Sequence, residues 1–220
     1  EFQSLPAERR EQMGLRPLDL NDLKGIALPH GRTGDSEWKI RQFSFAYKHQ
    51  PETLHIDEVE FPFCGATAII GHNGAGKTTT LKSVAGILNY DSGTITINGK
   101  DVKAEPIECK KITAYIPDNP DLYEYMTGIK YLNFIADIFG VGLDERKEKI
   151  NKYADIFEIK KDLGQPIAAF SHGMKQKLAI IAAWLHSPKL IIMDEPFVGL
   201  DPKAAHILKE MMREVCDEGG

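Results

Sequence analysis

Residues 71–79 form a glycine-rich stretch, Gly-His-Asn-Gly-Ala-Gly-Lys-Thr-Thr, directly after a run of apolar residues. Gly71, Gly74 and Gly76 allow the tight turns that point several backbone N–H groups at one anion. A helix that begins near Lys77 adds the positive end of its dipole at the same place. The pattern predicts a strand, a phosphate-binding loop and a helix in succession, which confines the chain to the α/β folds that bind nucleotides.

The side chains of this loop predict how a nucleotide and a magnesium ion are held. Lys77 can reach the β- and γ-phosphates, and the hydroxyl of Thr78 can bind Mg²⁺. Asn73 and Thr79 belong to the same loop and are predicted to contact the nucleotide as well. A simple glycine-rich turn is the alternative, but the strand and helix patterns on both sides favour nucleotide binding.

A second stretch, residues 189–196, reads Lys-Leu-Ile-Ile-Met-Asp-Glu-Pro. A continuous apolar strand is typical of a parallel sheet covered on both faces, and ligands of such sheets bind at the carboxyl ends of the strands. We expect Asp194 to hold the water shell of Mg²⁺ and Glu195 to polarise the attacking water as general base. The alternative is an ordinary strand end, since Asp, Glu and Pro commonly end strands.

A third stretch, residues 170–177, reads Phe-Ser-His-Gly-Met-Lys-Gln-Lys and opens an apolar helix. Ser171 is a good helix N-cap. Gly173 has no side chain, so a γ-phosphate could approach the start of the helix. Together the three stretches resemble those of ABC-type ATPases, the nucleotide-binding subunits of ATP-binding cassette transporters. The resemblance makes Ser171 and Gly173 the phosphate contacts of the signature motif. It places Asp201 in the loop after the catalytic Glu.

The resemblance covers about residues 38–218 and implies an α/β fold, a P-loop NTPase of the ABC-ATPase type. This fold has a mainly parallel central sheet, an antiparallel β subdomain and an inserted helical subdomain, here at about 118–170. Residues 1–35 are rich in Pro, Gly and charge and are predicted to be a linker or an N-terminal extension. Residues 36–220 are then the ABC ATPase domain.

The periodicity of apolar residues and the turn signals predict the individual elements. Antiparallel strands are expected at 38–45, 54–61 and 94–98, and parallel strands at 66–70, 112–116 and 190–193. Helices are expected at 77–88, 128–139, 144–157, 172–186 and 202–217. The helical spacing of Tyr131, Leu132, Ile135 and Phe139 predicts core packing rather than a docking surface.

Two further site residues follow from the resemblance. Tyr47 ends a strand pattern where the family places an aromatic ring that stacks on adenine; a tyrosine packed at a strand end is the alternative. Asp118 stands where the family presents a Gln to Mg²⁺ and the attacking water, so a catalytic and metal-binding role is assigned to it. A carboxylate can bind the metal but cannot donate a hydrogen bond. An ordinary turn residue is the alternative for Asp118.

The sequence also departs from the family. His172 and Met174 replace the usual Gly and Gln of the signature motif. The family carries a switch histidine after one more strand beyond the Gly-Leu-Asp segment, whereas this chain ends at Gly220 and offers only His206, which is too close. These departures predict a domain truncated at its C-terminal end, which binds ATP but hydrolyses it poorly.

The two halves of the chain resemble different branches of the family. Residues 15–71 resemble the region that leads into the second ATPase half of tandem energy-coupling-factor proteins, which drive vitamin and cobalt uptake. Residues 112–218 resemble ABC-2 type export ATPases. The leading function is therefore the ATP-hydrolysing subunit of an ABC membrane transporter, with ATP-driven dimerisation energising translocation. The alternatives are an energy-coupling-factor uptake ATPase, a chimaeric or truncated nucleotide-binding module, and an ABC ATPase of DNA repair or the ribosome.

Composition and the resemblance together predict the setting. The net charge of −5 offers no basic face for a duplex, so nucleic acid is not expected as a partner. Cys64, Cys109 and Cys216 are widely spaced and are expected to be free thiols in a reducing compartment. No apolar run approaches the ~20 residues that cross a bilayer. We expect a cytoplasmic protein, peripheral at the membrane, with transmembrane permease subunits and a second, head-to-tail ATPase subunit (homodimer or heterodimer) as partners. Neither the substrate nor the direction of transport follows from the sequence.

Overall fold

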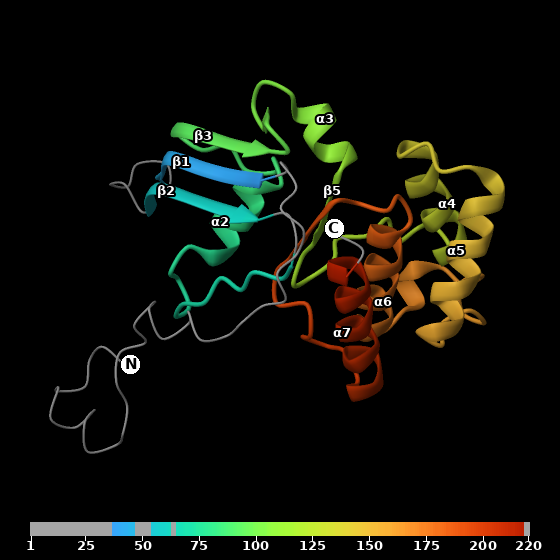
Figure 1. Ribbon diagram of the computed structural model, residues 1–220. Helices are drawn as coiled ribbons and strands as arrows, with labels where there is room; N and C mark the ends of the chain where they lie inside the picture. Colours follow the sequence, from blue (N-terminus) through green and yellow to red (C-terminus); the bar gives the residue numbers. More distant parts are fainter. Residues whose placement is uncertain (1–36, 47–53, 63–64, 218–220) are drawn as a thin grey trace, which may run out of the picture. The chain divides into compact units, whose positions relative to one another are not determined.

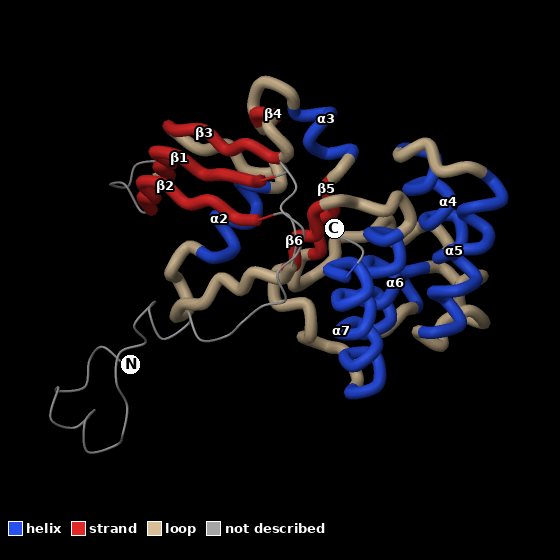
Figure 2. The backbone as a smooth tube through the Cα atoms, in the orientation of Figure 1, coloured by secondary structure: helices blue, strands red, loops and turns tan. Residues whose placement is uncertain are grey.

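The computed structural model describes residues 37–46, 54–62 and 65–217 (Figure 1). Within them lie an antiparallel sheet, a pair of parallel strands and a set of helices (Figure 2). The predicted linker at 1–35, the adenine-stacking Tyr47 and the thiol of Cys64 lie outside the described residues.

The antiparallel sheet has four strands in the order β2-β1-β3-β4. Their bounds are β1 Glu37–Phe45, β2 Leu54–Pro62, β3 Ser92–Ile97 and β4 Lys100–Asp101. Side chains alternate along β1: Ile40 is buried, and Arg41 on the other face pairs with Glu58 at 2.6 Å. The three predicted antiparallel strands are confirmed. A turn at Asn98 and Gly99 joins β3 to β4, with positive φ at both residues as two-residue hairpins favour.

Strand β1 has an irregularity in its pairing with β3. The register of the pair shifts between Arg41 and Ser44, and Gln42 within the shift has a φ of 47°. Gly93 of β3 lies against this kink with a φ of 90°, and a Cβ there would stand 2.3 Å from the carbonyl oxygen of Gln42. Only glycine fits such a close backbone approach.

The parallel strands are β5 (Thr113–Ile116) and β6 (Leu190–Met193), with Tyr115 opposite Ile192. They confirm the prediction of parallel strands at 112–116 and 190–193. Strand β5 is largely buried and β6 is half-buried apart from the buried Ile192, and the two hydrophobic clusters of the domain share these strands: Ile116 belongs to one cluster and Ile192 to the other. Burial from both sides explains the continuous apolar sequences of these strands.

The prediction of a strand at 66–70 is wrong. These residues belong to no strand and are exposed, with Ile70 at 80%. A cavity is lined by Ala66–Ile69 together with Leu190–Met193 of β6. An apolar run becomes a strand only where a neighbour completes its hydrogen-bond ladder. The described parallel sheet therefore has two strands.

The helices match the predictions with two differences. They are α2 Lys77–Val84, α3 Pro106–Lys111, α4 Gly128–Ile138, α5 Leu143–Ile156, α6 His172–Trp184 and α7 Pro202–Asp217, with a 3₁₀ turn at Ile167–Ala169. Helix α2 is shorter than predicted because Gly86, with a φ of 64°, follows its end. Helix α3 was not predicted, although Pro106 at its first position is a typical start signal.

Helices α4, α5 and α6 pack on one another, and α6 also packs on β5. Leu132 is fully buried in this cluster, and Tyr131, Ile135 and Phe139 pack against it, which confirms the predicted core face of α4. Helix α6 is buried over most of its length, so it lacks a polar face along its second half. The second cluster joins the antiparallel sheet to α2 and to Ile192.

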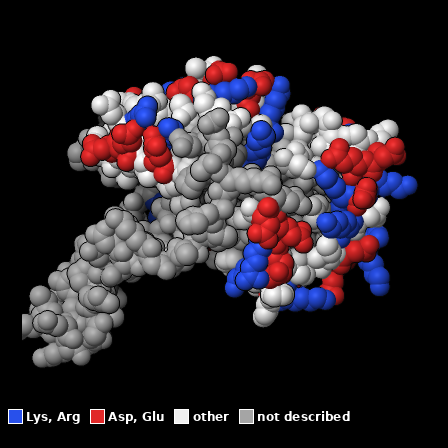
Figure 3. Space-filling model, viewed as in Figure 1, with Lys and Arg blue, Asp and Glu red and all other residues white. Residues whose placement is uncertain are grey.

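Charges of both signs are interspersed on the surface. Figure 3 shows Lys and Arg side chains beside Asp and Glu on the face in view. Ion pairs join some of them, as between Lys111 and Glu108 at 2.7 Å and between Lys149 and Glu145 at 2.6 Å. Within the described ranges, no helix has the length and apolarity needed to cross a membrane.

Candidate nucleotide-binding site

The predicted phosphate-binding loop leads directly into α2. Gly74 and Gly76 have φ values of 85° and 84°, which side chains rarely adopt. The loop closes on itself, since Ala75 N–H donates to the His72 carbonyl at 3.1 Å. A Cβ on Gly76 would also meet the Leu54 side chain at 3.0 Å. Glycine at position 76 is therefore favoured by the backbone conformation, and a larger residue would also require the Leu54 side chain to move.

The ammonium of Lys77 lies over this loop. It donates to the Gly71 carbonyl at 2.7 Å and to the His72 carbonyl at 3.2 Å. Gly76 has no side chain to cap α2, so the first N–H groups of the helix are left for an anion. The Gly71 and His72 carbonyls hold the Lys77 ammonium beside the free N–H groups of α2. The loop therefore suits a negatively charged phosphate group.

The other predicted loop residues differ in exposure. The side chains of Asn73 and Thr78 are exposed, whereas Thr79 is 8% exposed. Thr80, which was not predicted as a site residue, donates its hydroxyl to the Gly76 carbonyl at 3.0 Å and fixes the junction of loop and helix. Thr78 is therefore the threonine of the predicted site whose hydroxyl a metal ion can reach, while Thr79 is packed beneath it.

Two carboxylates follow strand β6. Asp194 is 4% exposed, and its N–H donates to the Ile116 carbonyl at 2.9 Å, which extends the parallel ladder. Glu195 is exposed and has a φ of 48°. A left-handed conformation costs a non-glycine residue about 1–2 kcal/mol, and such outliers cluster at functional sites. The strand end thus presents one buried and one accessible carboxylate.

Tyr115 of β5 contacts Asp194 and lies within the electrostatic reach of Asp118. Its hydroxyl donates to Oδ2 of Asp194 at 3.5 Å. Burial raises the pKa of Tyr115 well above its usual value, and the charges of Asp194 and then Asp118 raise it further. Asp194 follows β6 and Asp118 follows β5, so the two carboxylates that were predicted to bind Mg²⁺ come after different strands.

The donor set of this region suits magnesium. Mg²⁺ prefers oxygen ligands and is usually bound through one or two carboxylates together with substrate phosphates and water. Asp194 and Asp118 offer two carboxylates and Thr78 offers a hydroxyl, but Asp118 and Thr78 are not among the residues that line the cavity with Asp194. In the part of the chain that the structure describes, no group of three or more His, Cys, Asp or Glu side chains forms a metal site. The remaining ligands would come from the nucleotide and water.

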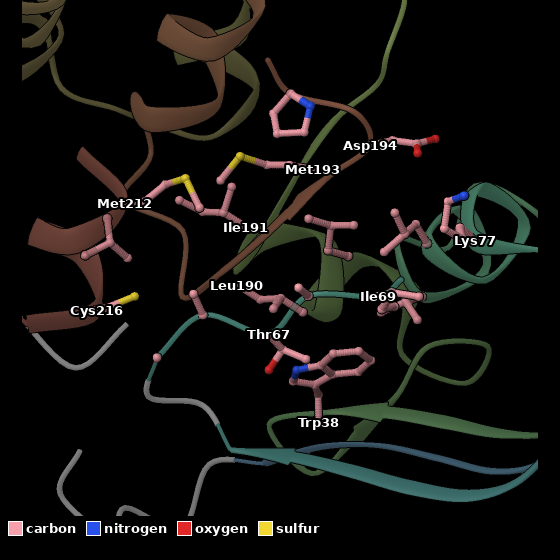
Figure 4. Close-up of a pocket in the computed structure, with 18 of the residues that line it drawn as sticks. Trp38, Thr67, Ile69, Lys77, Leu190, Ile191, Met193, Asp194, Met212 and Cys216 are labelled. Atoms are coloured by element: carbon pink, nitrogen blue, oxygen red, sulfur yellow. The ribbon is translucent and has the colours of Figure 1, made fainter. Parts of the chain in front are cut away.

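A cavity of about 350 Å³ brings the first two motifs together. Lys77, Asp194 and Glu195 all line it. Figure 4 shows Lys77 and Asp194 toward the same end of the cavity, with Met212 and Cys216 of α7 toward another. The sequence alone placed these charged groups on two separate motifs, and the fold brings them to the lining of one cavity.

The signature stretch begins α6 and contacts the loop before α7. The hydroxyl of Ser171 accepts from Met174 N–H at 3.3 Å, so the predicted N-cap is confirmed. A Cβ on Gly173 would stand 2.7 Å from the Gly199 carbonyl oxygen. A Cβ on Gly199 would stand 2.4 Å from the His172 ring. Glycine at both positions allows the two segments to touch.

Asp201 follows this contact and has two structural roles. Its Oδ1 accepts from Ala204 N–H at 2.8 Å, which caps α7. Its Oδ2 pairs with Lys177 of α6 at 2.7 Å, and the hydrogen bond from Lys177 lowers the pKa of Asp201 below its usual value. Asp201 therefore ties α7 to the signature helix.

Ser171 and Gly173 are not among the residues that line the cavity with Lys77 and Asp194. Two contacts near the signature were missed by sequence reasoning: the Lys177–Asp201 pair and an ion pair between Lys175 and Glu124. Lys175 and Glu124 are far apart in sequence, so no spacing rule connects them. Tyr115 was missed as a site residue too, although a tyrosine in an otherwise apolar buried strand was the signal.

Comparison with known proteins decides the family. A profile of the family described as ABC transporter matches residues 58–198. The chain belongs to the ABC transporter family. It is 39% identical over 152 residues to the ABC-type transporter ATP-binding protein EcsA of Bacillus subtilis (strain 168), a match that covers 69% of this chain and 61% of EcsA. The chain thus spans about six tenths of the length of this relative.

Solved structures of ABC ATP-binding subunits share the fold. One, described as the ATP binding subunit of an ABC transporter, has a TM-score of 0.75 and 36% identity and covers 82% of this chain and 75% of its own. CbiO1 of Clostridium perfringens, described as part of the complex cbiONQ, has a TM-score of 0.65 and 25% identity, with 81% and 74% covered. The predicted P-loop NTPase fold of the ABC-ATPase type is confirmed.

Proposed function

We propose that this chain is the ATP-binding and ATP-hydrolysing subunit of an ABC membrane transporter and energises translocation through ATP-driven dimerisation. The observation that carries the proposal is the cavity that Lys77, Asp194 and Glu195 line together. These groups suit the binding of a phosphate chain and the activation of water beside it. Membership of the ABC transporter family supports the same assignment.

Binding of the triphosphate uses the loop and the start of α2. Lys77 exchanges its contacts with the Gly71 and His72 carbonyls for oxygens of the β- and γ-phosphates. The N–H groups of the loop and of the first turn of α2 surround the same oxygens. Tyr47, which lies outside the described residues, is proposed to stack on adenine, where a purine ring gains from offset stacking.

Hydrolysis requires a metal site and a base. Asp194, Asp118 and Thr78 are the residues that would hold Mg²⁺, which when bound neutralises charge that develops on the transferred phosphate. Glu195, exposed at the end of β6, accepts the proton of the attacking water. General base catalysis of this kind contributes about 10²–10⁴-fold in rate.

The signature residues imply a second subunit. Ser171 and Gly173 lie at the start of α6 and do not line the cavity of their own chain. A two-fold, head-to-tail pair would bring the Ser171 of each subunit to the phosphates of the other, since each patch meets its opposite twice. The second subunit is either another copy or a related ATPase chain, and permease subunits hold the pair at the cytoplasmic face of the membrane.

A second candidate is an energy-coupling-factor uptake ATPase. The likeness to CbiO1, part of the complex cbiONQ, favours it. The two candidates share their ATP chemistry and differ in the membrane partner. Co-purification of the chain with a permease, followed by identification of that permease, separates them. The hypothesis of a chimaera stays a hypothesis, and the sequence of the source gene tests it.

The assembly is tested by light scattering with and without nucleotide at matched protein concentration. In a Glu195→Gln background, which keeps the shape of the side chain but removes the base, ATP with Mg²⁺ should shift the chain from monomer toward dimer. Adding Ser171→Arg should block the shift, because the bulk of Arg fills the start of α6. Asn151→Arg is the matched control, because it introduces the same side chain and the same charge on the exposed face of α5. It should leave the shift intact.

Each outcome of this experiment has a defined meaning. Titration calorimetry on the same samples establishes whether ATP binds. ATP binding without any dimer would overturn the assembly and leave the nucleotide site standing. Loss of the dimer with Asn151→Arg as well as Ser171→Arg would show that added positive charge, rather than the signature, blocks the pair.

A further inference from the structure

Tyr115 is the third residue of β5, one of the two strands of the parallel pair. It lies opposite Ile192 in the register of β5 and β6, and Asp194 comes shortly after Ile192 on β6. The Tyr115 hydroxyl donates to Oδ2 of Asp194 at 3.5 Å. The Asp194 carboxylate is buried, and its hydrogen bond with another side chain of the described residues is this one to Tyr115.

Packing does not explain why this residue carries a hydroxyl. The ring of Tyr115 packs against the cluster that contains Ile192 and the antiparallel sheet, and a phenylalanine would fill the same space. Tyr115 is half-buried, and a hydroxyl that loses part of its water contact is stabilised when it is hydrogen-bonded. Its bond goes to the carboxylate of the proposed metal site, so the hydroxyl is explained by what it does to Asp194.

A tyrosine hydroxyl has an ordinary pKa of about 10, so it carries its proton at neutral pH. A phenol that keeps its proton acts toward a carboxylate as a donor. The χ2 torsion of an aspartate is broad, so a buried carboxylate needs such a donor to hold one orientation.

We propose that Tyr115 is a positioning residue for the magnesium-binding carboxylate of Asp194. Its hydroxyl holds Oδ2 and leaves Oδ1 for the water shell of the ion. The same contact ties β5, which ends just before Asp118, to the carboxylate after β6. This inference rests on the proposed function, because it assigns Asp194 to Mg²⁺.

The test measures how ATP binding depends on magnesium in the Tyr115→Phe variant. Calorimetric affinity for ATP in EDTA should stay unchanged, because Lys77 and the loop are untouched. The Mg²⁺ concentration that gives half of the maximal gain in ATP affinity should rise about two- to ten-fold, the range expected for one lost hydrogen bond. A role in packing alone would leave this magnesium dependence unchanged.

Tyr131→Phe is the matched control. Tyr131 of α4 is half-buried as Tyr115 is, and desolvation followed by the charge of Tyr123 raises its pKa to about 12. Removal of the Tyr131 hydroxyl should leave the dependence of ATP binding on magnesium as it is in the parent chain. In an Asp194→Asn background, Tyr115→Phe should produce no additional rise, because the carboxylate that it positions is gone.

The outcomes separate this inference from the proposed function. A parent chain that responds to Mg²⁺, with Tyr115→Phe responding identically, overturns the positioning role alone. A parent chain that binds ATP equally in Mg²⁺ and in EDTA overturns the proposed magnesium site, and the inference with it. An equal rise in Tyr115→Phe with and without the Asp194 carboxylate would show that the hydroxyl acts through another group.

Discussion

Replacement of Lys77 by alanine tests the phosphate-binding loop most directly. In the free protein the Lys77 ammonium donates to the Gly71 carbonyl at 2.7 Å and to the His72 carbonyl at 3.2 Å. ATP must exchange these two contacts for contacts to phosphate oxygens. Lys77→Ala removes the ammonium and leaves the exposed carbonyls of the loop to water, so the free protein loses little.

The magnitude follows from this exchange. A hydrogen bond to a charged group contributes about 1.5–3 kcal/mol, which corresponds to about 10- to 150-fold in affinity. Because the loop carbonyls must be given up when Lys77 turns to the phosphates, the net loss should fall in the lower part of that range. We expect the affinity for ATP to weaken about 10- to 50-fold.

Titration calorimetry with ATP in Mg²⁺ and in EDTA measures the change. Lys82→Ala is the matched control, since Lys82 lies in the last turn of the same helix, away from the loop. The parent and Lys82→Ala should bind alike. An affinity of Lys77→Ala within two-fold of the parent would refute the assignment of the loop. An equal loss in both variants would point to overall charge instead of a specific contact.

Three further results are expected. Glu195→Gln should bind ATP as the parent does, while its ATP turnover falls about 10²–10⁴-fold; turnover at the parental rate would remove Glu195 as the base. Gly93→Ala should lower the free energy of unfolding by at least about 2 kcal/mol in urea titrations, because its Cβ would stand 2.3 Å from the Gln42 carbonyl oxygen at a φ of 90°; wild-type stability would contradict the close approach. Burial lowers the pKa of His186 below 6.5, so the unfolded chain binds the extra proton and the free energy of unfolding should fall as pH drops below about 6.5, levelling off below the folded pKa. His186→Phe, which can keep the stack on Phe139, should flatten this part of the pH profile; an unchanged profile would assign the effect to other groups.

Local sequence patterns were sufficient for most elements. The glycines at 71, 74 and 76 predict a tight loop, and Gly74 and Gly76 have the positive φ values that such a loop uses. Ser171 caps α6, as predicted, and the predicted strand at 38–45 forms with Ile40 buried beside exposed Arg41. Each of these features depends on residues that are neighbours in the chain, so the sequence carries the whole signal.

The predictions failed where a distant partner was needed. Residues 66–70 have the composition of a buried strand, yet they are exposed and unpaired, because strand structure requires a neighbouring ladder. The role of Tyr115 depends on register, since only the pairing of β5 with β6 sets its hydroxyl 3.5 Å from Asp194. The same holds for Lys175 and Glu124, which no spacing rule connects.

The chemistry of the site was readable from sequence because it resides in residue types: an ammonium, a hydroxyl, carboxylates and glycines within short motifs. Their arrangement was not. Tertiary structure decided that Lys77 and Asp194 line one cavity while Ser171 does not. It also decided that Asp194 is buried and Glu195 accessible, although the two are adjacent in the chain. Burial and proximity arise from packing between segments far apart in sequence, and no local pattern contains them.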